Sequence, residues 1–134
     1  MKTREEYAEI SANYYKSGYN CCQAIVLAFS DVVDQNEELL LKMSSSFGGG
    51  MGKMGEVCGA VSGMFMVLGL LEGNTDPKNQ AGKMQHYANV RLLADKFIEK
   101  NGFLRCRDLV GPEKKKCADL VSDCAKILFD YLND

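Results

Sequence analysis

Cysteine is the residue type of this 134-residue sequence best suited to chemistry, and six cysteines are present. A chain of this length buries roughly two thirds of its unfolded surface, so it does not need disulfides to fold. In a reducing compartment, cysteines more often act as metal ligands or as catalytic or redox thiols than as structural bridges. Packing as small buried hydrophobes is the competing interpretation. The six are Cys21, Cys22, Cys58, Cys106, Cys117 and Cys124.

Cys58 follows a glycine-dense stretch, and residues 48–63 read GGGMGKMGEVCGAVSG. A P-loop has glycine, four further residues, GK and then Ser or Thr. Here Phe47 stands at the first glycine position and Met54 follows Lys53, so phosphate binding of this type is not expected. A helix that begins just before Cys58 would place its thiol in the first turn, where free amides and the macrodipole favour a thiolate. That effect is about 0.3–1 kcal/mol, below one pKa unit, so a reactive Cys58 needs further charged neighbours.

Residues 105–117, RCRDLVGPEKKKC, supply such cationic groups. Cys106 lies between Arg105 and Arg107, and three lysines precede Cys117. Positive neighbours lower the pKa of a thiol. The spacing between the two cysteines is too wide for a CxxC redox turn and unlike that of a zinc ribbon, so spacing alone does not choose a chemistry.

Helical periodicity dominates the sequence, and no alternating strand pattern is present. We therefore expect one all-α domain over residues 1–134, a bundle of five or six helices joined by short loops. Pro77 and Pro112 are each expected at the first position of a helix, and Gly102 is expected to end the helix that Pro77 begins. The predicted helices are residues 3–16, 21–34, 37–44, 57–73, 77–101 and 112–132.

Two of these helices have a predicted apolar stripe. The stripe of the helix after Pro77 contains Ala81, Met84, Ala88, Leu92 and Phe97. The stripe of the last helix contains Cys117, Leu120, Val121, Cys124, Ile127, Leu128 and Tyr131.

The cysteines are expected at or near the starts of three helices and in one loop between helices. Such ends can converge on one side of a bundle. Four converged thiols could hold zinc or an iron–sulfur cluster, or form two exchangeable disulfides, and the sequence does not choose among these.

Charge and hydropathy exclude several classes of function. The formal net charge is −2, and the basic segment is too short to predict nucleic-acid binding. The longest apolar run, AVSGMFMVLGLL, falls short of the roughly 20 residues that span a bilayer, so membrane insertion is not expected. The charged N-terminal residues do not resemble a signal peptide. We therefore expect a cytoplasmic protein.

Four stretches of the sequence resemble the family of redox-active proteins named for the cysteine pattern C_GCAxxG_C_C. They are GYNCCQAIVLAF, GGGMGKMGEVCGAVSGMFMVLGLLEG, RCRDLVG and KKKCADLV, and together they extend over nearly the whole chain. The segment CGAVSG, followed by an apolar run and glycine, is the most specific of the four.

The resemblance implies four functional cysteines, called here the motif cysteines: Cys21, Cys58, Cys106 and Cys117. It also implies a supporting role for Gly59, Ala60 and Gly63 in the central motif. Cys22 and Cys124 stand where small residues are expected in the family, although the choice between Cys21 and Cys22 stays open. The small residues would leave one edge of a helix bare, so that another backbone can approach Cys58 closely.

The leading hypothesis is a thiol-disulfide oxidoreductase that needs no cofactor, in which Cys58 attacks as a thiolate and Cys106 or Cys117 resolves the intermediate. Its partner would be a redox protein or a small thiol. The alternative is a binding module whose four motif cysteines hold zinc or an iron–sulfur cluster for electron transfer or structure. A third interpretation is a helical interaction protein whose cysteines only pack. The sequence does not identify the redox partner, and a homo-oligomer stays open.

Overall fold

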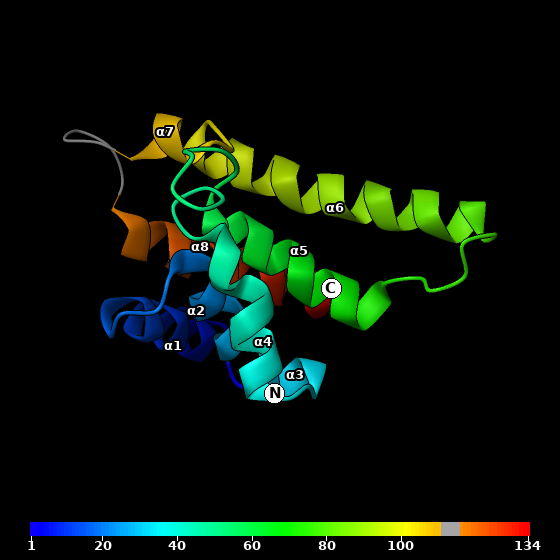
Figure 1. The fold of residues 1–134 in the computed structure, drawn as a ribbon, viewed down its shortest axis with the longest axis horizontal. Helices are drawn as coiled ribbons and strands as arrows, with labels where there is room; N and C mark the ends of the chain where they lie inside the picture. The colour runs from blue at the N-terminus through cyan, green and yellow to red at the C-terminus, as the bar shows by residue number, and fades with distance from the viewer. Residues whose placement is uncertain (111–115) are drawn as a thin grey trace.

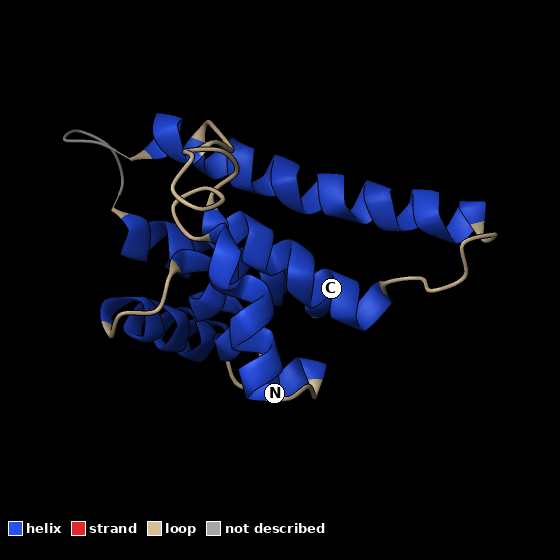
Figure 2. Cartoon of the chain, in the orientation of Figure 1, coloured by secondary structure: helices blue, strands red, loops and turns tan. Residues whose placement is uncertain are grey.

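The computed structural model describes residues 1–110 and 116–134, and over these ranges the protein is all-α (Figures 1 and 2). The described residues form eight α-helices and one 3-10 helix, with an isolated β-bridge between Val57 and Arg105. The all-α class is confirmed, whereas the count of five or six helices is wrong. The helices are α1 Arg4–Lys16, α2 Cys21–Ala28, α3 Ser30–Val33, α4 Glu37–Ser44, the 3-10 helix Ser45–Phe47, α5 Gly59–Glu72, α6 Gln80–Asn101, α7 Cys106–Leu109 and α8 Cys117–Leu132.

Two features account for the larger number of helices. The helix expected over residues 21–34 is interrupted at Phe29, whose backbone leaves helical geometry between α2 and α3. The Phe29 ring is fully buried and stacks on Tyr7 with ring centroids 4.4 Å apart, so packing of this ring accompanies the break. The second feature is α7, a single short turn in a segment expected to be a loop.

Local capping signals set three helix ends. Thr3 forms a capping box with Glu6 at the start of α1, and Asn20 forms one with Gln23 at the start of α2. Gly102 has φ 88° and ends α6, as predicted, because glycine adopts the left-handed conformation without a Cβ clash.

The expected role of Pro77 is wrong. Helix α6 begins at Gln80, because the side chain of Asn79 caps it by accepting a hydrogen bond of 2.9 Å from the Gly82 amide. Pro77 lies in the preceding turn, where the Lys78 amide donates to the Asp76 carboxylate at 2.9 Å. The corresponding prediction for Pro112 lies outside the described residues.

The predicted apolar stripe of α6 is also largely wrong. Met84 and Leu92 are 56 % and 43 % exposed, whereas Leu93 and Phe97 are fully buried. Only the C-terminal half of α6 contributes fully buried side chains, and its N-terminal half extends beyond the rest of the bundle in Figure 1. The stripe predicted for α8 is confirmed for Leu120, Val121, Cys124, Ile127 and Leu128, which are buried, whereas Cys117 and Tyr131 at its ends are half-buried.

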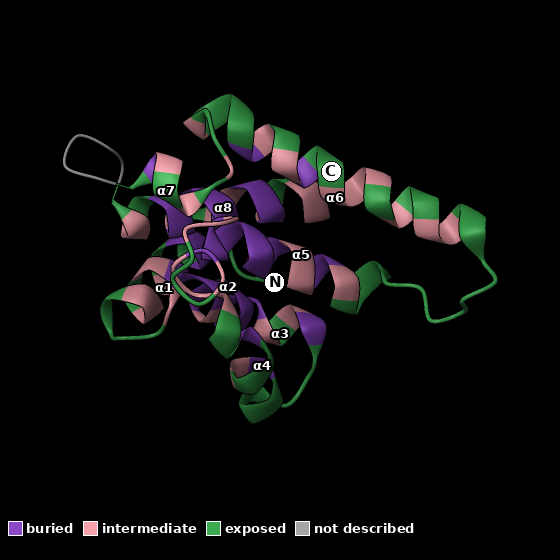
Figure 3. Ribbon diagram, turned by 45° about the horizontal axis from the view of Figure 1, so that its top comes forward, coloured by how far each residue is buried: buried purple, intermediate pink, exposed green. Residues whose placement is uncertain are grey.

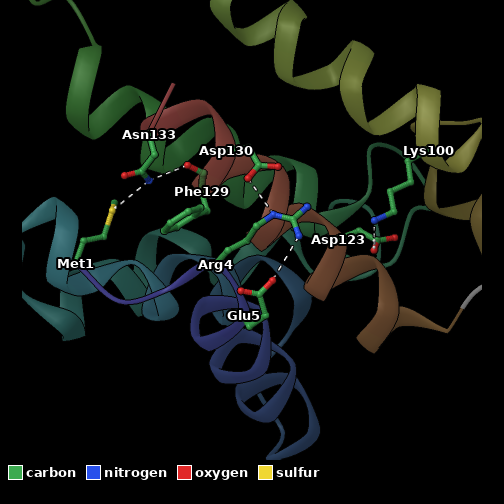
Figure 4. A network of polar contacts seen from close by, with 8 residues as sticks. All are labelled: Met1, Arg4, Glu5, Lys100, Asp123, Phe129, Asp130 and Asn133. Atoms are coloured by element: carbon green, nitrogen blue, oxygen red, sulfur yellow. Dashed lines mark hydrogen bonds and ion pairs between the residues drawn. The ribbon is translucent and has the colours of Figure 1, made fainter.

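The core lies between α2, α5 and α8, which carry most of the buried residues in Figure 3. Helix α1 packs chiefly on α8, and α2 packs chiefly on α5. Ion pairs at the surface accompany this packing: Arg4 of α1 contacts Asp130 of α8 at 2.9 Å, and Lys100 of α6 contacts Asp123 of α8 at 3.0 Å (Figure 4). Among the described helices, none combines the length and apolar character needed to cross a bilayer.

The close contact of α2 with α5 leads to a prediction for Gly63. A Cβ on Gly63 would lie 2.8 Å from Ile25 Cβ and 3.1 Å from the Cys22 carbonyl oxygen, whereas a Cβ on Gly69 would meet nothing within 4 Å. Gly63→Ala should lower the free energy of unfolding by about 1–3 kcal/mol through overpacking. Gly69→Ala, in the same helix, should raise it by up to about 1 kcal/mol through helix propensity. Urea unfolding midpoints measure both changes, and equal effects would contradict this account of the interface.

Candidate functional site

The four motif cysteines all lie at the N-terminal ends of helices. Cys21, Cys106 and Cys117 are the first residues of α2, α7 and α8, and Cys58 is the residue just before α5. Cys106 was expected in a loop and instead begins α7. The starts of α7 and α8, the turn before α2 and the loop before α5 all lie toward the left side of the molecule in Figure 1. These helix starts therefore lie on one side of the bundle, an arrangement that the sequence allows but does not require.

Residues 48–56, called here the glycine loop, turn back on themselves before Cys58. Three consecutive hydrogen bonds close the turn: the amides of Lys53, Gly55 and Glu56 donate to the carbonyls of residues 48, 49 and 50. Several residues of the turn have left-handed φ angles, which include 64° at Lys53 and 74° at Gly50. Gly50 has a second reason to be glycine, because a Cβ there would lie 2.8 Å from the Cys106 Cβ.

Antiparallel backbone contacts join the end of the glycine loop to the start of α7. The Cys58 amide donates to the Leu104 carbonyl at 2.8 Å, and the Cys106 amide donates to the Glu56 carbonyl at 2.7 Å. They flank the bridge between Val57 and Arg105. Because side chains alternate along extended backbone, Cys58 and Cys106 lie on the same face of this pairing.

Arg107 holds the glycine loop from the side of α7. Its Nε donates to the Gly55 carbonyl at 3.1 Å, and its Nη2 donates to the Met54 carbonyl and to Glu56 Oε1, both at 2.8 Å. Arg105 is a weaker partner, with its Nη2 3.5 Å from the same Glu56 oxygen. Both arginines that flank Cys106 are thus engaged with one carboxylate.

The expectation that these arginines would lower the pKa of Cys106 is wrong. Burial raises the pKa of Cys106, and the nearby Cys117 and Cys21 thiols raise it further. The arginine charge is directed to Glu56 instead of to the sulfur. Cys106 is half-buried, so its thiol is still reachable.

Cys58 is the most enclosed of the motif cysteines, at 3 % exposure. Burial raises the pKa of its thiol from 9.0 to about 12, while the backbone amides of Ala60 and Val61 at the start of α5 lower it by less. This balance is expected, because a helix terminus contributes only about 0.3–1 kcal/mol. Cys58 therefore carries a proton at neutral pH.

Cys21 lies against the bare edge of α5 that the motif glycines provide. A Cβ on Gly59 would lie 3.3 Å from Cys21 Sγ and 2.8 Å from the Phe47 carbonyl oxygen. Burial raises the pKa of Cys21, and the Gly49 amide opposes this effect. Its neighbour Cys22 is fully buried on the other side, with its sulfur 3.7 Å from that of Met66. Of the two, the geometry favours Cys21 as the functional thiol.

An open cavity of about 780 Å³ lies over the motif cysteines, and Cys21, Cys106 and Cys117 line it. Cys58 is not among its lining residues. Tyr15 of α1 also lines the cavity, and a hydrogen bond with Cys117 is the largest of the effects that raise the pKa of the Tyr15 hydroxyl. Sequence reasoning missed Tyr15, because its contact with α8 joins residues far apart in the chain and leaves no local signal.

The motif thiols lie near enough to one another for the charge on one to affect the pKa of another. Cys117 and Cys21 raise the pKa of Cys106, and Cys21 and Cys106 raise the pKa of Cys58. All six cysteines are unpaired. Within residues 1–110 and 116–134, no group of three or more cysteine, histidine or acidic side chains stands at metal-binding spacing. The zinc or iron–sulfur alternative thus gains no geometric support from the described residues.

The fold and site define a class: an all-α protein with a cluster of free thiols at one end of a helical bundle. The chain belongs to the family described as "Putative redox-active protein (C_GCAxxG_C_C)", whose model matches residues 19–131. It is also similar to an uncharacterized protein of Archaeoglobus fulgidus, with 26 % identity over alignment positions that cover 100 % of this chain and 98 % of the relative. No solved structure matches the chain.

The difference in burial predicts an order of reactivity among the thiols. In brief alkylation with iodoacetamide at pH 8, the half-buried Cys106 and Cys117 should be labelled first. Cys58 should be labelled at least about tenfold more slowly, because it is buried and protonated. Peptide mass spectrometry measures each rate, and the unfolded protein, in which all six thiols should react alike, is the control. Labelling of Cys58 as fast as Cys117 would contradict this order.

The contacts of Arg107 predict that it stabilises the glycine loop. Arg107→Ala should raise hydrogen exchange of the Gly55 and Glu56 amides by about tenfold, or about 1.4 kcal/mol of local stability. Arg105→Ala is the matched control, because it removes only a half-exposed ion pair worth at most about 1 kcal/mol. Hydrogen exchange followed by mass spectrometry measures both. If the two variants exchange alike, Arg107 has no special role.

Proposed function

We propose that this protein is a thiol-disulfide oxidoreductase whose exchange reaction takes place at the cavity over Cys21, Cys106 and Cys117. The observation that carries the proposal is the meeting of motif cysteines from four separate helix starts, three of which line one open cavity. Membership of a family described as redox-active supports the same function. Scattered cysteines that only pack would have no reason to share an open cavity.

Accessibility supports Cys117 as the attacking thiol in place of the expected Cys58. An attacking thiol must be reached by the partner disulfide and must ionise. Cys58 does neither readily, at 3 % exposure and with a pKa raised to about 12 by burial. Cys117 is half-buried, lines the cavity and begins α8.

The exchange has two steps. The Cys117 thiolate attacks one sulfur of a disulfide RSSR, which forms a mixed disulfide and releases one thiolate RS⁻. The Cys106 thiolate then attacks the Cys117 sulfur, which forms the Cys106–Cys117 disulfide and releases the second RS⁻. The two protons lost by the protein thiols end on the two released thiols. Overall, one disulfide is reduced and two protein thiols are oxidised, and the reverse reaction runs through the same intermediate.

Cys21 and Cys58 form an inner pair in this proposal. Cys21 is close enough to Cys117 and to Cys58 for charge on one thiol to affect the next. Exchange between the inner pair and the Cys106–Cys117 disulfide would restore the outer thiols and leave a buried disulfide. The motif would then contain two pairs of thiols, and only the pair Cys106 and Cys117 has both thiols at the cavity.

Six unpaired thiols are typical of a reducing compartment, and we therefore propose that the protein is located in the cytoplasm. The partner is a redox protein or a small thiol. No cofactor takes part in the exchange as written.

The proposed roles predict different outcomes for two single variants. With excess small disulfide, Cys106→Ser should accumulate a stable mixed disulfide at Cys117, because the resolving thiol is absent. Cys117→Ser should form the mixed disulfide at least about tenfold more slowly, because the accessible attacking thiol is lost. Intact-mass measurement and peptide mapping follow both. Cys124→Ala, which changes a fully buried cysteine outside the motif, is the control and should behave as the parent protein.

Three outcomes would overturn the proposal. The first is mild oxidation that produces no disulfide among the motif cysteines. The second is stoichiometric zinc or iron in anaerobically purified protein that is lost in Cys58→Ser, which would favour the metal-binding module. The third is a loss of stability alone, with exchange intact, in both Cys106→Ser and Cys117→Ser, which would favour packing alone.

A further inference from the structure

The cavity over the motif cysteines carries an uneven charge. Its lining includes the ammonium groups of Lys16 and Lys53 and contains no aspartate or glutamate among the described residues. Lys16 is in the last turn of α1, and Lys53 belongs to the glycine loop, so the two cations come from separate elements that border one cavity. Neither lysine forms an ion pair with a carboxylate in the described part of the chain, in contrast to Lys2, Lys42 and Lys100.

Neutral hydrogen-bonding groups complete this lining. Tyr19, Asn20 and Ser45 supply a hydroxyl, an amide and a second hydroxyl near the Cys21 side of the cavity. The Ser45 hydroxyl donates to the Lys42 carbonyl at 2.7 Å, and one Asn20 amide hydrogen donates to the Ser45 carbonyl at 3.2 Å. The Tyr19 hydroxyl and the second Asn20 amide hydrogen can therefore donate to an anion. The volume of about 780 Å³ lies within the range of about 300–1,000 Å³ usual for small-molecule sites.

The lining of the cavity is positively charged, whereas the whole chain has a negative net charge. The formal net charge is −2, so the protein as a whole repels an anion at long range. The reacting group is itself an anionic thiolate, which also repels an anionic disulfide. Lys16 and Lys53, which have no carboxylate partner among the described residues, offset that repulsion where the substrate reacts.

We propose that the preferred substrate of this site is a small disulfide or thiol that carries carboxylate or phosphate groups near its sulfur, held by Lys16 and Lys53. The inference rests on the proposed thiol-disulfide exchange and adds the charge class of the substrate. The anionic group lies between the two lysines, and this placement directs the substrate sulfur toward Cys117. The bonds that form and break are those of the exchange described above.

Three small disulfides of different charge test the inference on the reduced full-length protein. They are 3,3′-dithiodipropionate, a dianion, 2-hydroxyethyl disulfide, which is neutral, and cystamine, a dication. Each second-order rate constant is divided by that of the same disulfide with a free monothiol, which removes differences in intrinsic reactivity. At low salt, the dianion should be favoured over the dication by at least about tenfold. The preference should shrink toward unity at 0.5 M salt, where the Debye length is only about 4 Å.

The variant Lys16→Gln/Lys53→Gln should abolish this preference without blocking exchange, because both side chains are exposed and neither reacts. Lys78→Gln is the control. It also removes one exposed positive charge, in the segment between α5 and α6 on the opposite side of the molecule (Figure 1), and it should keep the preference.

Equal rates for the three disulfides, or faster reaction of cystamine, would overturn the inference and leave the exchange standing. If the double variant keeps the preference, the lysines do not cause it. If none of the disulfides oxidises the protein, the exchange itself fails and the inference fails with it.

Discussion

The antiparallel pairing between the glycine loop and the start of α7 is the contact on which the thiol cluster depends. Two backbone hydrogen bonds, from Cys58 to Leu104 and from Cys106 to Glu56, hold segments that are distant in the sequence. Because these bonds are made by the main chain, the placement of the two cysteines does not depend on their sulfur atoms. The thiols are free to change oxidation state while the backbone that positions them stays paired.

The glycines of the motif serve this same arrangement. Gly50 leaves room for Cys106, and Gly59 leaves room for Cys21, so each removes a Cβ at a point where a cysteine approaches. Gly63 does the same for the backbone of α2 one turn further along α5. The glycines therefore leave room for the side chains of Cys21 and Cys106 beside the glycine loop and α5. Burial then orders the thiols from Cys58 at the base to Cys106 and Cys117 at the open cavity.

Local signals made part of this structure predictable. The stripe of α8 was correct because this helix packs along its length, and the boundary at Gly102 was correct because a glycine can adopt a left-handed φ. The stripe of α6 failed because half of that helix has little to pack against, so periodicity did not report burial. The motif cysteines were identified by resemblance to a family, and helical periodicity alone did not predict whether their helix starts would converge. The roles of Arg107 and Tyr15 could not be predicted, because both depend on contacts between residues far apart in the chain.

The six cysteines of this protein form two groups, one that packs in the core and one that lies at the candidate site. Cys22 and Cys124 are fully buried, and Cys22 contacts the sulfur of Met66, as a small hydrophobic side chain would. Burial raises the pKa of both thiols, and neither lines the cavity. They stand where the family pattern leads one to expect small residues, so a cysteine there fills a core position of similar size. The motif cysteines lie instead at or just before helix starts, and Cys21, Cys106 and Cys117 line the open cavity.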